Sequence, residues 1–109
     1  QKTPMLFLDE PTTYLDMYYQ LELLELIRRL NREYELTIAM VLHDINQAIR
    51  YSDRVIAMKG GRIVAQGSPQ DVITEDSILD IYGVRVIVRR EEHAGLFILP
   101  VGTGAPALR

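Results

Sequence analysis

The chain has 109 residues, of which 48% are hydrophobic and 25% are charged. This balance is typical of one soluble globular domain and disfavours a disordered segment. Because nucleic-acid-binding surfaces are normally basic, the formal net charge of -3 predicts no nucleic-acid partner. The sequence has no cysteine, which excludes disulfides, thiolate metal sites and cysteine nucleophiles and fits a cytosolic protein.

No stretch of the sequence predicts a membrane helix or a signal peptide. The longest apolar runs fall well short of the roughly 20 residues that a membrane helix requires. The first residues, Gln1 to Pro4, lack the apolar region of a signal peptide. We therefore expect any association with a membrane to occur through a partner.

A short apolar run, Met5–Leu8, is followed at once by two carboxylates and a proline. Large apolar residues without alternation predict a strand covered on both faces, as in a parallel sheet. Pro11 cannot continue such a strand. We therefore expect Asp9 and Glu10 at its C-terminal end, the edge at which open α/β sheets bind their ligands.

The next segments predict a helix and a second strand. The helix is expected from about Met17 to Arg32, and its apolar residues recur at helical spacing and should pack on the sheet: Tyr19, Leu23, Leu26, Ile27 and Leu30. The run Leu36–Leu42 is rich in β-branched residues and predicts a buried strand. Strand, helix and strand form a parallel unit with a right-handed crossover, which brings His43 to the edge that carries Asp9 and Glu10.

After His43 the pattern changes to short helices and antiparallel hairpins. Three helix starts are expected: Asp44 before Ile45–Tyr51, with Gln47 as a capping-box partner, Ser68 before Pro69, and Thr74 before a helix that ends at Gly83. Two hairpins are expected: Arg54–Lys59 with Arg62–Gln66 around Gly60-Gly61, and Val84–Arg90 with Leu96–Leu99. Residues from Pro100 to Arg109 are expected to form a tail. The predicted fold class is α/β, with parallel strands and a crossover helix followed by antiparallel hairpins and short helices.

Asp9, Glu10 and His43 together indicate chemistry on a nucleotide. ATP hydrolysis needs one acidic group for Mg²⁺, usually through water, and a second to orient the attacking water. Asp9 suits the first role and Glu10 the second, while His43 could donate a hydrogen bond to the terminal phosphate. Each motif on its own also has a non-catalytic explanation. Asp9-Glu10 can be a polar strand end, and His43 can be a structural residue.

Two stretches of the sequence match a known family. MLFLDEPTTYLD, followed by IAMVLHDINQAIRYSDRVIAMKGGRIVAQGSPQDVI, closely resembles the C-terminal part of an ATP-binding cassette (ABC) ATPase. The resemblance covers nearly the whole chain and is strongest to the ATPase subunits of iron-siderophore, haem and cobalamin importers. It implies a partial P-loop NTPase fold, with residues 1–100 forming the C-terminal part of the ATPase domain and 101–109 a tail.

The resemblance assigns roles to individual residues. Met5–Asp9 match the Walker B strand of the family, with Asp9 binding Mg²⁺ through water, and Glu10 matches its catalytic glutamate. His43 matches the switch histidine, which contacts the γ-phosphate of ATP. Leu15 and Asp16 match the end of the D-loop at the interface of two ATPase domains, and from the sequence alone Asp16 is also expected to be the N-cap of the following helix.

The resemblance also implies partners, location and what this chain lacks. The expected partners are a second ATPase subunit in a homodimer, integral membrane permease subunits and a substrate-binding protein, which would place the ATPase peripherally on the cytoplasmic face of the cell membrane. No segment matches the phosphate loop G-x-x-x-x-G-K-[ST] or the serine-glycine-glycine signature. We therefore expect the chain to begin just after the signature and to be inactive alone. Its first strand is expected to have an unpaired edge and exposed apolar surface.

Two other functions stay open at this stage. The first is a soluble ABC-type ATPase that acts on ribosomes or DNA, although DNA-repair and chromosome-organising ATPases lack the importer-like continuation from Gly60 to Val72. The second is a non-catalytic regulatory module on the same scaffold. The hydrolytic function predicts that Glu10 is required for ATP turnover, and the regulatory function predicts that it is dispensable.

Overall fold

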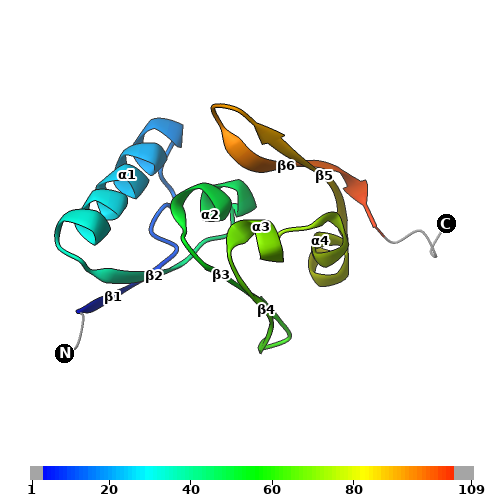
Figure 1. Cartoon of the computed structure of the whole chain (residues 1–109), viewed down its shortest axis with the longest axis horizontal. Helices are drawn as coiled ribbons and strands as arrows, with labels where there is room; N and C mark the ends of the chain where they lie inside the picture. The colour runs from blue at the N-terminus through cyan, green and yellow to red at the C-terminus, as the bar shows by residue number, and fades with distance from the viewer. Residues whose placement is uncertain (1–3, 105–109) are drawn as a thin grey trace. The chain divides into compact units, whose positions relative to one another are not determined.

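The computed structural model describes residues 4–104 (Figure 1), so part of the predicted tail, residues 105–109, lies outside the described residues. The chain divides after Asp44 into two compact units. Unit 1 contains the first two strands and the long helix, and unit 2, from Ile45 onward, contains the short helices and both hairpins. None of the helices in the described part of the chain is both long and apolar enough to cross a membrane.

Unit 1 is the predicted parallel unit. It runs β1 (Met5–Asp9), α1 (Met17–Glu33) and β2 (Thr37–Val41). The two strands pair in parallel, with Met5 opposite Thr37 and Asp9 opposite Val41. The strand–helix–strand prediction is therefore confirmed, and the carboxyl ends of both strands meet at one edge of the sheet.

Helix α1 begins at the expected cap but buries a narrower stripe than predicted. The Asp16 side chain accepts a hydrogen bond of 3.2 Å from the backbone N–H of Tyr19, so its role as N-cap is confirmed. Leu24 and Ile27 are buried, whereas Tyr19 and Leu26 are exposed. The prediction was wrong for these two because a sheet of two strands covers only one narrow side of the helix.

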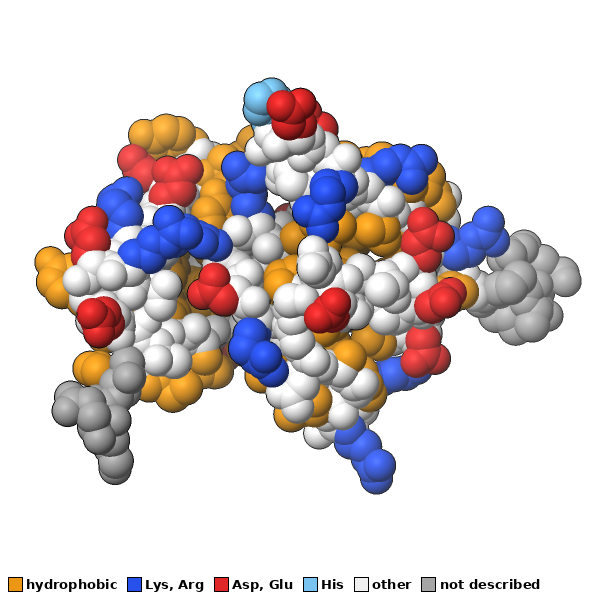
Figure 2. Space-filling view, in the orientation of Figure 1, with side chains coloured by type: hydrophobic (Ala, Val, Ile, Leu, Met, Phe, Trp, Pro, Cys, Tyr) orange, Lys and Arg blue, Asp and Glu red, His pale blue; other side chains and the backbone are white. Residues whose placement is uncertain are grey.

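The strand β1 is exposed, contrary to the expectation of cover on both faces. Met5 is 69% exposed and Phe7 is 63% exposed, and because alternate residues of a strand point the same way, both lie on one face. The described part of unit 1 has a single helix, which can cover only the other face. The apolar surface expected for this chain is therefore present, and Figure 2 shows further hydrophobic side chains at the surface among charged ones.

The first hairpin of unit 2 forms as predicted. After α2 (Ile45–Tyr51), β3 (Val55–Lys59) pairs antiparallel with β4 (Arg62–Gly67). Gly60 and Gly61 connect them with φ values of 58° and 78°, a left-handed conformation that favours glycine.

Two short helices follow, with the expected terminal signals. Ser68 is the N-cap of α3 (Pro69–Val72), and Thr74 is the N-cap of α4 (Glu75–Tyr82). Each cap side chain accepts a backbone hydrogen bond from the first turn of its helix. Gly83 ends α4 in the left-handed conformation, with φ of 68°.

The last hairpin is longer than predicted. β5 (Val84–Glu91) pairs antiparallel with β6 (Gly95–Thr103), so paired strand replaces the irregular tail expected for residues 100–103. Pro100 lies opposite Val86, next to an irregularity in the strand register. A proline fits at such a point because regular pairing through its nitrogen is not required there.

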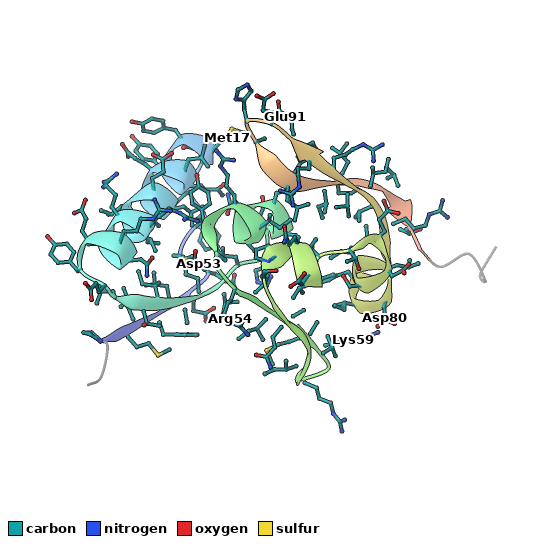
Figure 3. All side chains as sticks on the ribbon, viewed as in Figure 1. Met17, Asp53, Arg54, Lys59, Asp80 and Glu91 are labelled. Atoms are coloured by element: carbon teal, nitrogen blue, oxygen red, sulfur yellow. The ribbon has the colours of Figure 1, made fainter. Side chains whose placement is uncertain are left out.

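Unit 2 has a core built from all of its parts. The buried residues come from α2, α3, α4 and both hairpins and form one cluster: Ile49, Ala57, Val72, Ile73, Ile78, Val86 and Ile98. A hydrogen bond at the surface also links two elements of unit 2. Lys59 Nζ, at the end of β3, donates a hydrogen bond of 2.6 Å to the carbonyl oxygen of Asp80 in α4, and Figure 3 labels both residues.

Candidate functional site

Glu10 and His43 meet where β1 and β2 end. His43 Nε2 lies 2.9 Å from Glu10 Oε2, and the His43 side chain is 74% exposed and that of Glu10 39% exposed. The backbone N–H of Glu10 donates a hydrogen bond of 2.9 Å to the carbonyl oxygen of Val41, which continues the pairing of the two strands by one residue. The parallel pairing therefore brings together the two residues that the sequence singled out, and leaves them open to solvent.

The backbone of Glu10 has an unusual conformation. Its φ is 50°, in the left-handed region that non-glycine residues seldom occupy. This conformation ends the extended run of β1, where successive side chains would alternate between faces. Such strain persists where the surrounding structure enforces it and is concentrated at functional sites, which supports a role for this carboxylate.

Thr13 completes the contacts of the Glu10 carboxylate. Its Oγ1 donates a hydrogen bond of 3.2 Å to Oε1, while His43 approaches Oε2. The backbone N–H of Thr13 also donates to the Glu10 carbonyl oxygen at 3.2 Å, so a tight turn brings the hydroxyl back to the carboxylate. Sequence reasoning missed this contact, although the spacing of three residues across Pro11 was a usable signal for a turn.

The contacts of Glu10 favour its ionised form. The hydrogen bond from His43 is the main cause that lowers the pKa of the Glu10 carboxyl below its ordinary value, with a smaller contribution from Thr13 and an opposing one from partial desolvation. Glu10 is therefore a carboxylate at neutral pH, as a group that orients a water molecule must be.

The contact between Glu10 and His43 is expected to break on acidification. Because the pKa of Glu10 is lowered in the folded chain, the stabilisation is complete above the ordinary value of 4.5 and is lost as the pH falls below 4.5 through the lowered pKa. Titration of the Glu10 Cδ resonance by NMR should give a midpoint below 4.5, and His43→Ala should move it upward. A wild-type midpoint at or above 4.5 would contradict the contact.

Asp9 directly precedes Glu10 in the chain. It is the last residue of β1, opposite Val41, and it is exposed. Residues 4–104 contain no group of three or more His, Cys, Asp or Glu side chains that could hold a metal ion. Mg²⁺ in nucleotide sites typically has one or two carboxylates and takes its remaining ligands from water and phosphates, so a single exposed Asp9 fits that kind of site.

The loop between β1 and α1 turns Tyr14 outward. Thr12 is almost buried, and its carbonyl oxygen accepts a hydrogen bond of 3.3 Å from Gln20 Nε2. Tyr14 is fully exposed with φ of 71°, and Leu15 is 36% exposed. Asp16 then caps the helix. The loop is thus anchored at both ends and presents its middle to solvent.

The chain resembles known proteins over most of its length. No protein-family model matches it. It is 47% identical over 98% of its length to the ferric enterobactin transport ATP-binding protein of Escherichia coli K12, and 50% identical over 79% of its length to a petrobactin import ATP-binding protein of Bacillus anthracis. The chain is a homologue of ABC transporter ATP-binding proteins. It spans 40% of the length of the first of these relatives and 32% of the length of the second.

Solved structures agree with the fold of an ABC ATPase. A metal-chelate type ABC transporter in an inward-facing conformation superposes with a TM-score of 0.77 over 96% of this chain and 42% of that chain, at 19% identity. A component of the cbiONQ ABC transporter complex of Clostridium perfringens superposes with a TM-score of 0.59 over 70% of this chain and 30% of that chain, at 37% identity. The ABC resemblance and the α/β class stated from the sequence are confirmed.

Proposed function

We propose that this chain is the C-terminal portion of the ATP-binding and ATP-hydrolysing subunit of an ABC importer, with Glu10 and His43 as its catalytic pair. The single observation that carries this proposal is the 2.9 Å contact between Glu10 and His43 at the carboxyl ends of two parallel strands. Sites for nucleotides lie at this edge of open α/β sheets. The same two residues are those that the sequence resemblance implies for catalysis.

Each residue of the pair has a defined role in this proposal. The Glu10 carboxylate accepts a proton or hydrogen bond from the attacking water, for which its lowered pKa keeps it ionised. His43 Nε2–H, which donates to Glu10 in this structure, is the donor for an oxygen of the γ-phosphate. Asp9 would hold Mg²⁺ through water, and the ion would supply positive charge to the phosphates.

The chain supplies one wall of the site. It contains no match to the phosphate-loop pattern or to the family signature, and it spans 40% of the length of the first relative. Residues 1–100 then form the C-terminal part of the ATPase domain. The phosphate loop supplies most of the electrostatic cradle for the nucleotide, so the 109-residue chain alone is expected to be inactive.

The proposed assembly follows the transport function of the relatives. Their names describe import or transport of ferric enterobactin and petrobactin, and another relative, 41% identical over 86% of this chain and 38% of its own length, is a hemin import ATP-binding protein of Escherichia coli O157:H7. We propose a homodimer with Leu15 and Asp16 at its interface, bound to permease subunits at the cytoplasmic face of the membrane and served by a substrate-binding protein. The substrate class is an iron-siderophore, haem or cobalamin.

Co-purification tests the transport function against its alternatives. The complete subunit, tagged and extracted from membranes with a mild detergent, is expected to bring down an integral membrane protein, and the untagged subunit serves as the control. Recovery of ribosomes or DNA without a membrane protein would contradict the importer and support a soluble ATPase. Association with a permease but no dependence of ATP turnover on Glu10 would support a regulatory module.

A further inference from the structure

The two oxygens of the Glu10 carboxylate have different partners. His43 Nε2 lies 2.9 Å from Oε2, and Thr13 Oγ1 donates a hydrogen bond of 3.2 Å to Oε1. All three residues belong to unit 1. One carboxylate oxygen is thus held from beyond the end of β2, and the other from the loop that follows β1.

The position of Thr13 is set by a turn that starts at Glu10. The backbone N–H of Thr13 donates a hydrogen bond of 3.2 Å to the carbonyl oxygen of Glu10. Pro11 occupies the second position of this four-residue turn, where the fixed φ of proline suits the turn backbone. The turn therefore brings the hydroxyl back to the side chain of the residue at which it begins, through bonds that do not involve His43.

The middle of the same loop is anchored to α1. Thr12 is 9% exposed, and its carbonyl oxygen accepts hydrogen bonds from the backbone N–H of Leu15 at 3.2 Å and from Gln20 Nε2 at 3.3 Å. Gln20 lies in α1, so the loop is attached to the helix as well as to the end of β1. A residue between two such attachments has few backbone torsions free, so Thr13 offers its hydroxyl to Glu10 at little further cost in entropy.

In the proposed function, His43 leaves the carboxylate during hydrolysis. Its Nε2–H donates to Glu10 in this structure and is needed by an oxygen of the γ-phosphate, and one N–H does not serve both fully. When His43 turns to the phosphate, Oε2 loses this partner while Oε1 keeps the hydroxyl of Thr13. A carboxylate that is held by one oxygen and open at the other is suited to orient an attacking water.

We propose that Thr13 is a positioning residue for Glu10: its hydroxyl holds Oε1, so that the carboxylate keeps its orientation when His43 releases Oε2 for water. The consequence for ATP turnover rests on the proposed function. The effect of the hydroxyl on the conformation of the Glu10 side chain is a property of unit 1 and is measured without nucleotide.

NMR on the 109-residue chain tests the hold on Glu10 after its other partner has been removed. In a His43→Ala background, the three-bond couplings along the Glu10 side chain are expected to be unequal, as for one dominant rotamer. Thr13→Val keeps the branched shape but removes the hydroxyl. Added to this background, it is expected to average the couplings, with the held rotamer losing about 2- to 10-fold in relative population, the bias that one hydrogen bond supports.

Two further variants in the His43→Ala background serve as controls. Thr13→Ser keeps a hydroxyl and is expected to preserve the unequal couplings of Glu10. Thr37→Val makes the same change as Thr13→Val at the opposite end of the same sheet, where Thr37 pairs with Met5, and it should leave the couplings unchanged.

ATP turnover provides a second readout, in a subunit that carries this chain together with a phosphate loop. Thr13→Val is expected to lower kcat by about 2- to 10-fold and to leave KM for ATP nearly unchanged, because the hydroxyl orients a carboxylate that acts on water and not on bound ATP. Thr13→Ser is expected to restore kcat. A purely structural role of Thr13 would not produce this separation of kcat from KM.

Three outcomes would overturn the proposal. The first is averaged couplings of Glu10 in His43→Ala alone, and the second is a folded His43→Ala, Thr13→Val chain that keeps them unequal. The third is an unchanged kcat in Thr13→Val when turnover requires Glu10. If Thr13→Val fails to fold, Thr13→Ala takes its place with the same expected results. Turnover that does not depend on Glu10 would contradict the proposed function and leave the NMR results unaffected.

Discussion

Replacing Glu10 by Gln, in a subunit that carries this chain together with a phosphate loop, is expected to reduce ATP turnover by about 10²- to 10⁴-fold, the usual contribution of a general base. The change keeps the shape of the side chain but leaves one oxygen, which can accept from His43 or from Thr13, and it removes the negative charge that in the proposed function orients and activates water. ATP should still bind and should accumulate on the protein. Phosphate release and retained radiolabelled ATP measure the two effects.

Glu22→Gln provides the control for this experiment. Glu22 is exposed on α1, where its carboxylate accepts a hydrogen bond of 3.0 Å from Tyr18 Oη, and it takes no part in the site. The control is expected to keep wild-type turnover. Undiminished turnover in Glu10→Gln would exclude the catalytic role, and Glu10-dependent turnover by the 109-residue chain alone would contradict its expected inactivity.

Replacing Ile78 by Ala is expected to lower the free energy of unfolding by about 2–5 kcal/mol, the range for truncating a buried isoleucine. Ile78 is 1% exposed and lies in the core cluster of unit 2 with Ile49, Val86 and Ile98. The substitution leaves a cavity in the core that α4 shares with α2, α3 and the two hairpins. Since small domains are stable by only about 5–15 kcal/mol, urea unfolding followed by circular dichroism should show a large decrease in the midpoint.

Ile63→Ala is the matched control for the core substitution. It makes the same change in the same unit, but Ile63 lies in β4 and is 55% exposed. Little buried surface is lost there, so the unfolding midpoint is expected to remain close to that of the wild type. Equal effects of the two substitutions would mean that Ile78 does not pack in a core.

Local signals predicted most of the secondary structure. Ser68 and Thr74 start helices, and Gly60-Gly61 turns a hairpin, because each depends on the backbone within a few residues. The face of α1 was harder to predict. Tyr19 and Leu26 have the right spacing for burial, but which apolar residues are covered depends on the number of strands beneath the helix.

The proximity of Glu10 and His43 was predicted from the sequence, whereas the contacts that surround them were missed. Glu10 and His43 follow from two strand ends that parallel pairing brings to one edge. In unit 2, the hydrogen bonds between the Asn46 side chain and the backbone of Ile98 could not be predicted, because the two residues are 52 positions apart and nothing local distinguishes this asparagine from a solvated one. Contacts of this kind depend on the tertiary fold, which periodicity and caps do not specify.

The left-handed backbone of Glu10 has a consequence for efforts to engineer this chain. Glycine adopts a φ of 50° without the steric cost that a glutamate bears, so a screen for thermal resistance alone should favour Gly at position 10. Such a screen would select against the carboxylate itself. With Glu10 as the catalytic residue that we propose, stability and activity make opposite demands at this position, and a screen that also selects for ATP turnover is expected to keep the glutamate in its left-handed conformation.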